Sequence, residues 1–335
     1  MKKMTIPRRL FRYLAAAAAL LVTGVAAPPV GMAQTYPTRQ ITMVVPFAAG
    51  GPSDVIGRVF AEKMRVSLGQ HIIVENAPGA GGSIGSGRVA RAAGDGYTLV
   101  LGFWGTHVAN GALYALRYDL LNDFEPIALL VSNPMLILAR KTMPANDLQG
   151  LIAWLKANPD KAAAGNGGVG TPPHVIAAFF RNVTSTRFNL VPYRGAGPAL
   201  QDLVAGQIDL MFDYPVTSLP QVSAGTVRAY AVTAKNRLTA APGIPTVDEA
   251  GLPQFYFSIW YALWSSKGTP RTIIAKLNDA AQEAMADSAV RTRLADVGVD
   301  VPPRDQQTPE ALGAFQKSEI EKWWPIIKAA GIKVE

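Results

Sequence analysis

The chain has 335 residues, of which 49% are apolar and 17% charged, and it contains no cysteine. This length is typical of two domains, and the apolar share excludes an intrinsically disordered protein. The missing cysteines exclude disulfide bonds, thiolate metal sites and thiol nucleophiles.

The formal net charge of +8 is concentrated at the N-terminus. Residues 1–33 contain five Lys and Arg side chains and no acidic one, which leaves +3 for the rest of the chain. An apolar run over 14–27 follows, and it is shorter than the roughly 20 residues that a membrane span needs. This pattern predicts a secretory signal peptide over 1–33, cleaved after Ala33. We therefore expect a soluble protein of a bacterial periplasm that binds no nucleic acid.

From residue 40 onward, short β-branched runs alternate with helical patterns, as in βαβ units built around a parallel sheet. The predicted strands are 41–45, 71–76, 97–103, 188–193, 208–214 and 228–234. Near the C-terminus, helical spacing predicts helices over 270–285 and 309–324. The rhythm indicates an α/β fold.

Two longer apolar segments, 126–140 and 255–266, lack helical spacing and are expected to cross between two lobes. We therefore predict a two-lobed α/β protein, each lobe a mainly parallel sheet flanked by helices, joined by two crossing strands. In this division, domain 1 comprises 36–135 plus 256–335, and domain 2 comprises 136–255.

A glycine-rich turn follows the first strand and runs into a helix. The candidate binding residues of this turn are Phe47, Ala48, Ala49, Gly50, Gly51, Ser53 and Asp54. Ser53 or Asp54 can cap free amides at the helix start. Phe47 lies inside the turn and can cover an apolar part of a ligand.

A second glycine-rich turn occupies the middle of the chain. Its candidate binding residues are Asn166, Gly168, Val169, Gly170, Thr171 and His174. Thr171 is predicted to be the N-cap of the following helix, with Pro172 at the first helical position, where a missing N–H costs nothing.

The start of a helix carries unpaired N–H groups and the positive end of the helix dipole, and glycines let a ligand approach the main chain. Two such turns, one in each lobe, suit a solute with carboxylate groups. For a single turn, ordinary α/β scaffolding is the better interpretation. For two turns in different lobes of an exported protein, we favour binding.

Four further residues follow strands, where ligand groups gather at the carboxyl edge of a parallel sheet. Arg194 can donate charge-assisted hydrogen bonds to a carboxylate, and Asp213 follows a neighbouring strand. Trp104 either covers a ligand or fills the core, and the sequence leaves this open. His107 and His174 can both face a cleft, where a supporting role is favoured over catalysis.

Two short motifs indicate other functions. Gly165, Gly167 and Gly170 match G-x-G-x-x-G, but no acidic residue follows at the spacing of a dinucleotide site. The segment 81–85 matches G-x-S-x-G around Ser83, which would be a hydrolase nucleophile, but no strand directly precedes it. The three histidines have no metal-binding spacing. We expect neither a cofactor nor an enzyme, with a periplasmic hydrolase as an alternative.

Several segments together resemble a known family. They include MVVPFAAGGPSD, VENAPGAGGSIGSGRVARAAGDGY, VPYRGAGPALQDLVAGQIDLMFD and WYALWSSKGTP. In this order they are similar to the substrate-binding proteins of tripartite tricarboxylate transporters, the Bug-type receptors. The resemblance covers nearly the whole chain after the signal peptide.

The resemblance implies a type II-like periplasmic binding fold that closes on a small organic carboxylate and presents it to the permease subunits of a membrane transporter. It assigns ligand binding to 47–54 and 166–174, through main-chain amides and ordered waters. Pro173 stands where the family usually has a histidine. A sensor for a membrane kinase is the further alternative, and a monomer is expected.

Overall fold

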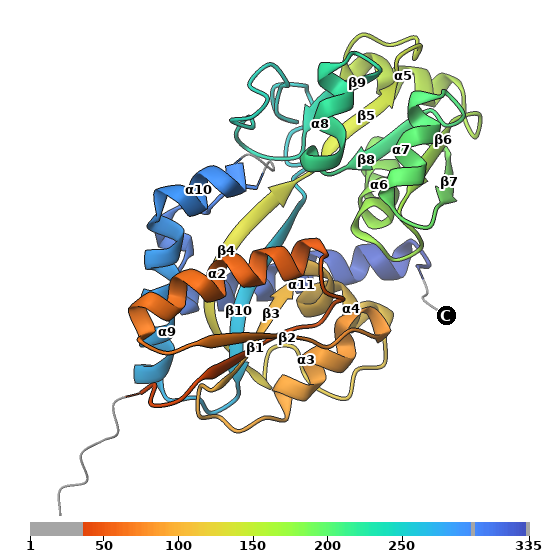
Figure 1. Cartoon of the computed structure of the whole chain (residues 1–335). Helices are drawn as coiled ribbons and strands as arrows, with labels where there is room; N and C mark the ends of the chain where they lie inside the picture. The colour runs from red at the N-terminus through yellow and green to blue at the C-terminus, as the bar shows by residue number, and fades with distance from the viewer. Residues whose placement is uncertain (1–35, 296–298, 333–335) are drawn as a thin grey trace, which may run out of the picture. The chain divides into compact units, whose positions relative to one another are not determined.

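A computed structural model describes residues 36–295 and 299–332 of the chain. The predicted signal peptide and its cleavage after Ala33 lie outside these residues. From Arg39 onward the chain forms one compact unit that contains two five-stranded sheets (Figure 1). In the two described ranges, no helix combines the length and the apolar character that crossing a membrane requires.

The first sheet and its helices form the part that we name lobe 1. The strands are β1 (Ile41–Val45), β2 (Ile72–Asn76), β3 (Thr98–Phe103), β4 (Phe124–Pro134) and β10 (Ser258–Ser266). Their order is β2-β1-β3-β10-β4, and β10 alone runs against the others. Helices α2 (Pro52–Leu68), α9 (Arg271–Ala286) and α11 (Pro309–Ala329) pack on this sheet or on one another. The shorter elements are η1 (Ala80–Gly82), α3 (Ser83–Ala90), η2 (Gly105–Ala109), α4 (Asn110–Leu113), α10 (Ser288–Ala295) and η3 (Arg304–Gln306).

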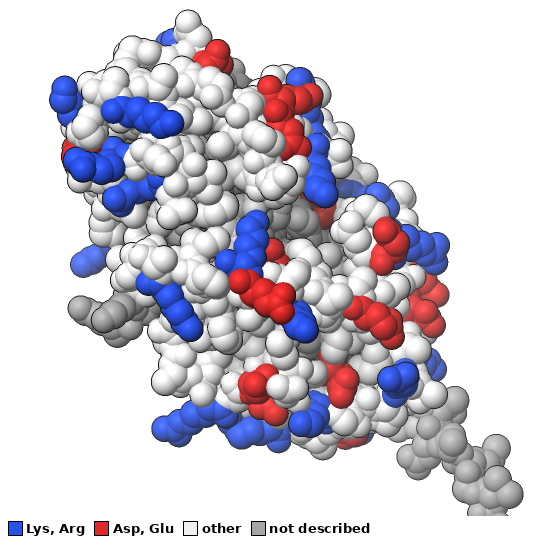
Figure 2. Space-filling model, turned by 180° about the vertical axis from the view of Figure 1, so that it is seen from behind, with Lys and Arg blue, Asp and Glu red and all other residues white. Residues whose placement is uncertain are grey.

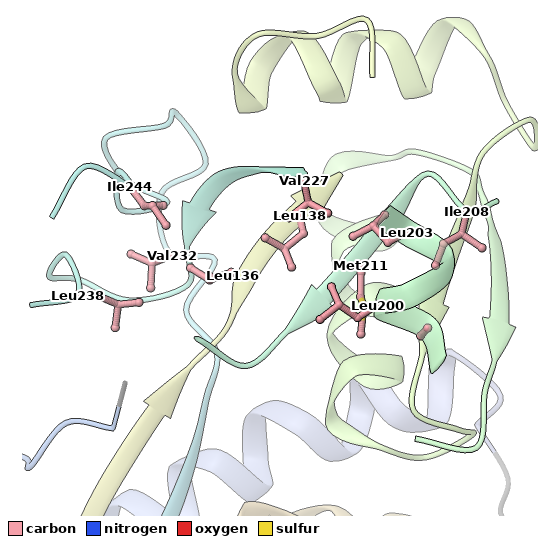
Figure 3. Packing of buried hydrophobic residues seen from close by; sticks show 11 residues of the cluster. Leu136, Leu138, Leu200, Leu203, Ile208, Met211, Val227, Val232, Leu238 and Ile244 are labelled. Atoms are coloured by element: carbon pink, nitrogen blue, oxygen red, sulfur yellow. The ribbon is translucent and has the colours of Figure 1, made fainter. Parts of the chain in front are cut away.

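The second sheet defines lobe 2. Its strands are β5 (Leu136–Arg140), β6 (Ala163–Asn166), β7 (Asn189–Pro192), β8 (Leu210–Asp213) and β9 (Val227–Val232). Their order is β7-β6-β8-β5-β9, and β5 alone runs against the rest. The helices are α5 (Leu148–Ala157), α6 (Pro172–Thr184), α7 (Ala196–Val204) and α8 (Pro215–Ser223). Figure 3 shows side chains of β5, β8, β9 and α7 meeting in the core of this lobe.

Two crossings join the lobes, and they meet at one buried side chain. β4 leads directly into β5, and the chain returns through 255–257 into β10. The hydroxyl of Thr233 accepts from the amide of Met135 at 2.9 Å and donates to the carbonyl of Phe257 at 2.6 Å. The amide of Thr233 also donates to the carbonyl of Met135 at 2.8 Å. One residue therefore holds both crossings together.

The predicted fold class is confirmed. Four strands of each sheet run in the same direction, as a mainly parallel sheet requires, and the fifth is a crossing strand or its continuation. The exception has a simple cause, because a strand that enters or leaves a lobe at the hinge needs no helical crossover and pairs antiparallel with its neighbours.

Candidate functional site

The first glycine turn, residues 46–51, connects β1 to α2. Ala48, Ala49 and Gly50 are exposed. Gly51 is the N-cap and Pro52 is the first helical residue. Gly50 has a φ of +82°, which is why a glycine stands there. The turn thus presents bare main chain at the start of a helix.

Asp54 organises this turn from the first turn of α2. Its carboxylate accepts from the amide of Gly50 at 2.9 Å, from Nε of Arg58 at 3.0 Å and from Nδ2 of Asn76 at 3.0 Å. These contacts, led by Arg58, lower the pKa of Asp54 to about 2. Asp54 therefore holds the turn through Gly50, which precedes the helix, instead of capping an amide of the helix itself as predicted. Ser53 makes no capping bond either, and its hydroxyl lies near that of Tyr261.

Asp54 accepts from the amide of Gly50, but the neighbouring amides of the turn remain without a partner in the described part of the chain. Among the described residues, the amides of Ala48, Ala49, Gly51, Ser53 and Asp54 have no acceptor. Helix geometry explains the last two, because the first amides of any helix lack intrahelical partners. Together with the helix dipole they form a place for an anionic group.

The second glycine turn, residues 167–171, connects β6 to α6 and differs from the first. The amide of Gly168 donates to Oδ1 of Asn166 at 3.0 Å, and that of Gly170 donates to Nδ1 of His174 at 3.3 Å. Thr171 is the N-cap, as predicted, but its hydroxyl donates back to the carbonyl of Gly168 at 2.6 Å. It therefore caps no helix amide, which corrects the predicted role of its side chain.

Two prolines further reduce what α6 offers. Pro172 and Pro173 have no N–H, and the amide of His174 donates to Thr171 at 2.9 Å. The expected cluster of free amides is therefore absent from the start of α6 in the described structure. The adjacent start of α7 offers the amides of Ala196 and Gly197, which have no acceptor among the described residues, although Pro198 has no N–H. The N-cap of α7, Gly195, has a φ of +110°, and the amide of Ala196 lies 3.6 Å from where a Cβ on Gly167 would stand.

Sequence reasoning singled out Arg194 on this neighbouring turn but missed the helix start beside it. Arg194 is exposed and directly precedes Gly195. Its guanidinium has no partner among the described residues. The signal that was available is the run Arg194-Gly195-Ala196-Gly197-Pro198, which places two glycines and an N-terminal proline where a helix begins.

Two buried side chains stand at the carboxyl ends of β6 and β8. Asn166 and Asp213 are both 0% exposed, and Nδ2 of Asn166 and Oδ1 of Asp213 have no hydrogen-bond partner. The other oxygen of Asp213 accepts from Thr217 at 2.5 Å and from Ser218 at 3.1 Å. Burial raises the pKa of Asp213. The hydrogen-bonding atoms of Asn166 and Asp213 are thus only partly paired within the protein.

Two tyrosines, one in each lobe, lie near each other. The hydroxyl of Tyr261 on β10 lies near that of Ser53 at the start of α2. Tyr214 directly follows Asp213, and burial together with the nearby Tyr261 raises its pKa well above the usual value. Tyr261 is thus near both Ser53 of the first helix and Tyr214 at the end of β8, and β8 pairs with β6. No motif marked either tyrosine in the sequence.

Phe47, in lobe 1, is joined to Tyr261 through the ring of Phe103. Its ring is partly exposed and meets Phe103 edge-on at 5.2 Å between centroids. Phe103 in turn stacks on Tyr261 at 5.8 Å. Phe47 therefore forms an apolar wall beside the free amides.

Two predicted site residues belong to the core of lobe 1. Trp104 is 0% exposed and packs edge-on against Phe257 and Trp323. His107 is also 0% exposed and stacks on Trp264 with 3.8 Å between centroids. The structure does not bring these rings to the glycine turns. Trp104 is thereby assigned to the core, which the sequence had left open.

His174 faces a different hollow. It is half-buried and lines a groove of about 580 Å³ between α6 and the end of α11. Arg181, Pro325 and Ile326 line the same groove. Burial and the nearby Arg181 lower the pKa of His174. The side chain of His174 contacts the second turn through the hydrogen bond that it accepts from the amide of Gly170.

The hydrolase and metal alternatives find no site in the described residues. The hydroxyl of Ser83 donates to the carbonyl of Ala80 at 2.7 Å, and no histidine is among its partners there. Within 36–295 and 299–332, no group of His, Asp and Glu side chains could hold a metal ion. Figure 2 shows acidic and basic side chains next to one another on one face.

Comparisons with known proteins extend over nearly the whole chain. A sequence model described as tripartite tricarboxylate transporter family receptor matches residues 56–332. BugT of Bordetella pertussis is 34% identical over 326 residues, covering 97% of this chain and 99% of BugT.

Solved structures give the same result. MatC from Rhodopseudomonas palustris with bound malate is 41% identical, with a TM-score of 0.72, and the match covers 87% of this chain and 100% of MatC. Rpa4515 of R. palustris with adipate is 30% identical, with a TM-score of 0.74 and coverage of 89% and 100%.

Proposed function

Because the chain belongs to the tripartite tricarboxylate transporter family of receptors, we propose that it captures a small carboxylate-bearing solute between its lobes and delivers it to a membrane permease. Its family and its structural relatives are solute receptors and not enzymes, and the protein is likewise a solute receptor. Its family is one of periplasmic binding proteins, so its place of action is the periplasm.

The observation that carries the proposal is the set of free amides at the start of α2. They stand beside Tyr261, which lies near Tyr214 of lobe 2. A carboxylate that accepts from these amides would lie at the junction of the lobes. Neutral N–H groups in a fixed arrangement bind an anion without the desolvation cost of a buried cation.

The ligands bound to two structural relatives support a carboxylate as the solute. MatC was solved with malate and Rpa4515 with adipate, both of which are dicarboxylates. In this chain, Phe47 to Asp54 would hold one carboxylate. Asn166, Gly168, Val169, Arg194 and Asp213, with the start of α7, would hold the other end.

Further parts of the proposal rest on the sequence pattern and the family. They are cleavage near Ala33, partnership with the permease subunits, a monomeric state, and domain boundaries at 135/136 and 255/256. The chain passes from lobe 1 to lobe 2 between β4 and β5 and returns to lobe 1 before β10, close to these boundaries.

A matched pair of variants tests the free amides. Gly51 has a φ of −81°, which proline adopts, and a Cβ there would meet only the carbonyl oxygen of Ala48 at 3.6 Å. Gly51→Pro removes one N–H and should weaken binding of malate or adipate at least about tenfold in calorimetry, because a hydrogen bond to a charged group contributes roughly 1.5–3 kcal/mol.

Gly51→Ala keeps the N–H and should bind like the wild type. Succinamide, the neutral relative of succinate, should not bind. Wild-type protein that binds none of malate, succinate and adipate would refute the proposed class of ligand, and equal binding by Gly51→Pro would refute the assigned amides.

A further inference from the structure

α6 of lobe 2 meets α11 of lobe 1 at the ring of Phe179, and the neighbouring Phe180 packs edge-on against Phe255 with 5.5 Å between centroids. Phe179 stacks on Phe255 of the return crossing, with 5.0 Å between centroids and 12° between ring planes. The same ring meets Trp323 of α11 edge-on, at 5.1 Å and 74°. A single residue of lobe 2 therefore contacts both the hinge segment and the long C-terminal helix.

Lys322 closes the contact from the α11 side. Its Nζ donates to the carbonyl of Tyr256 at 3.0 Å. The same ammonium lies 5.6 Å from the ring centroid of Phe179 and 4.7 Å from that of Trp323, within cation–π range of both. Lys322 thus links α11, the return crossing and α6.

The docked helix also carries the second glycine turn. Thr171 is the N-cap of α6, and Gly170 is bonded to His174 in its first turn. Phe179 lies two turns further along the same helix. Because a short α-helix moves as a rigid body, the contact at Phe179 sets where this turn stands relative to lobe 1.

We propose that Phe179 and Lys322 are positioning residues that hold the lobes in the ligand-binding arrangement without touching the ligand. The consequence for binding rests on the function proposed above. The consequence for lobe position does not, and it is measurable without any ligand.

The chain has no native cysteine, so two spin labels can be placed without background labelling. Val66 on α2 is 70% exposed and Val204 on α7 is 40% exposed, one in each lobe. With labels at Val66→Cys and Val204→Cys, double electron–electron resonance reports the distance between the lobes. Phe179→Ala should shift and broaden this distance in ligand-free protein.

The same substitution should weaken binding of malate or adipate about tenfold, mainly through faster dissociation, because it removes two aromatic pairs at once. Phe179→Tyr keeps the ring and should restore both distance and affinity. Lys322→Met keeps an unbranched apolar side chain but removes the charge and the hydrogen bond to Tyr256, and it should weaken binding by about threefold. Val183→Ala is the control, an exposed position on the same helix.

An unchanged distance distribution in both Phe179→Ala and Lys322→Met overturns the proposal, whether or not affinity changes. Changed distances with unchanged affinity also overturn it. If wild-type protein binds neither acid, the proposed function fails, while the distances still decide whether these residues hold the lobes. If Phe179→Ala does not fold, Lys322→Met provides the same two measurements.

Discussion

His107 lies flat against Trp264, and burial lowers the pKa of its imidazole to about 3. Its Nδ1 is 2.9 Å from the hydroxyl of Thr106, and its Nε2 has no partner in the described structure. A ring in this position stays neutral at physiological pH, because a charge there would lose its hydration without gaining a counter-ion. This side chain therefore acts as a core aromatic.

The burial of His107 makes the stability of the protein depend on pH. The unfolded chain takes up a proton at His107 near its ordinary pKa of 6.5, whereas the folded chain does so only near 3. Between these values the unfolded state binds more protons, so acid lowers the free energy of unfolding by up to about 1.4 kcal/mol per pH unit.

His107→Gln should remove this part of the acid sensitivity, which urea titrations at several pH values between 7 and 4 would measure. His71→Gln, at an exposed position, is the control for replacing a histidine as such. An equal slope in wild type and His107→Gln would contradict the assignment.

At the scale of elements, the packing of α3 explains the glycines at and near its start. A Cβ on Gly85 would lie 2.8 Å from the carbonyl oxygen of Ala77 and 2.9 Å from Cβ of Pro46. Gly82, with a φ of +89°, lets the chain turn into the helix. The G-x-S-x-G match is therefore explained by close packing of α3 beneath the first glycine turn.

Gly85→Ala should lower the free energy of unfolding by about 1–3 kcal/mol, because the added methyl has no space. Gly313→Ala in α11 is the matched control, since its Cβ would meet only Pro126 at an ordinary 3.5 Å. That change should stabilise the protein by up to about 1 kcal/mol. Denaturant midpoints measure both, and a neutral Gly85→Ala would refute the packing argument.

For the whole molecule, the hinge depends on the hydroxyl of Thr233. It satisfies the amide of Met135 and the carbonyl of Phe257, both at the junction of the lobes. Motion between lobes must pass through these two crossings, so the bonds at Thr233 determine how the segments move together.

Thr233→Val keeps the shape but leaves these two buried groups without the hydroxyl. It should cost about 1–3 kcal/mol of unfolding free energy and speed hydrogen exchange at the Met135 amide. Thr233→Ser keeps the hydroxyl and should retain slow exchange. Exchange at Met135 that is equal in all three proteins would show that the hydroxyl does not hold the crossings.

The local structure of the first glycine turn was predicted well, because strand, turn and helix start are adjacent in the sequence. The second turn was predicted less well. Pro172 indicated a helix start, but the same proline, with Pro173, removes the amides that such a start would offer. Tyr214 and Tyr261 were missed because they are 47 positions apart and nothing local marks that they lie near each other.

By itself, the amino-acid sequence determined the strands, the two crossings, the family and the glycine turn after β1, since these depend on local periodicity and on residues close in the chain. Only the tertiary structure decided that His107 and Trp104 are core residues, that α7 rather than α6 offers free amides, and that Phe179 docks on α11. These features depend on which distant side chains meet, and burial, not residue type, then sets the chemistry of each group.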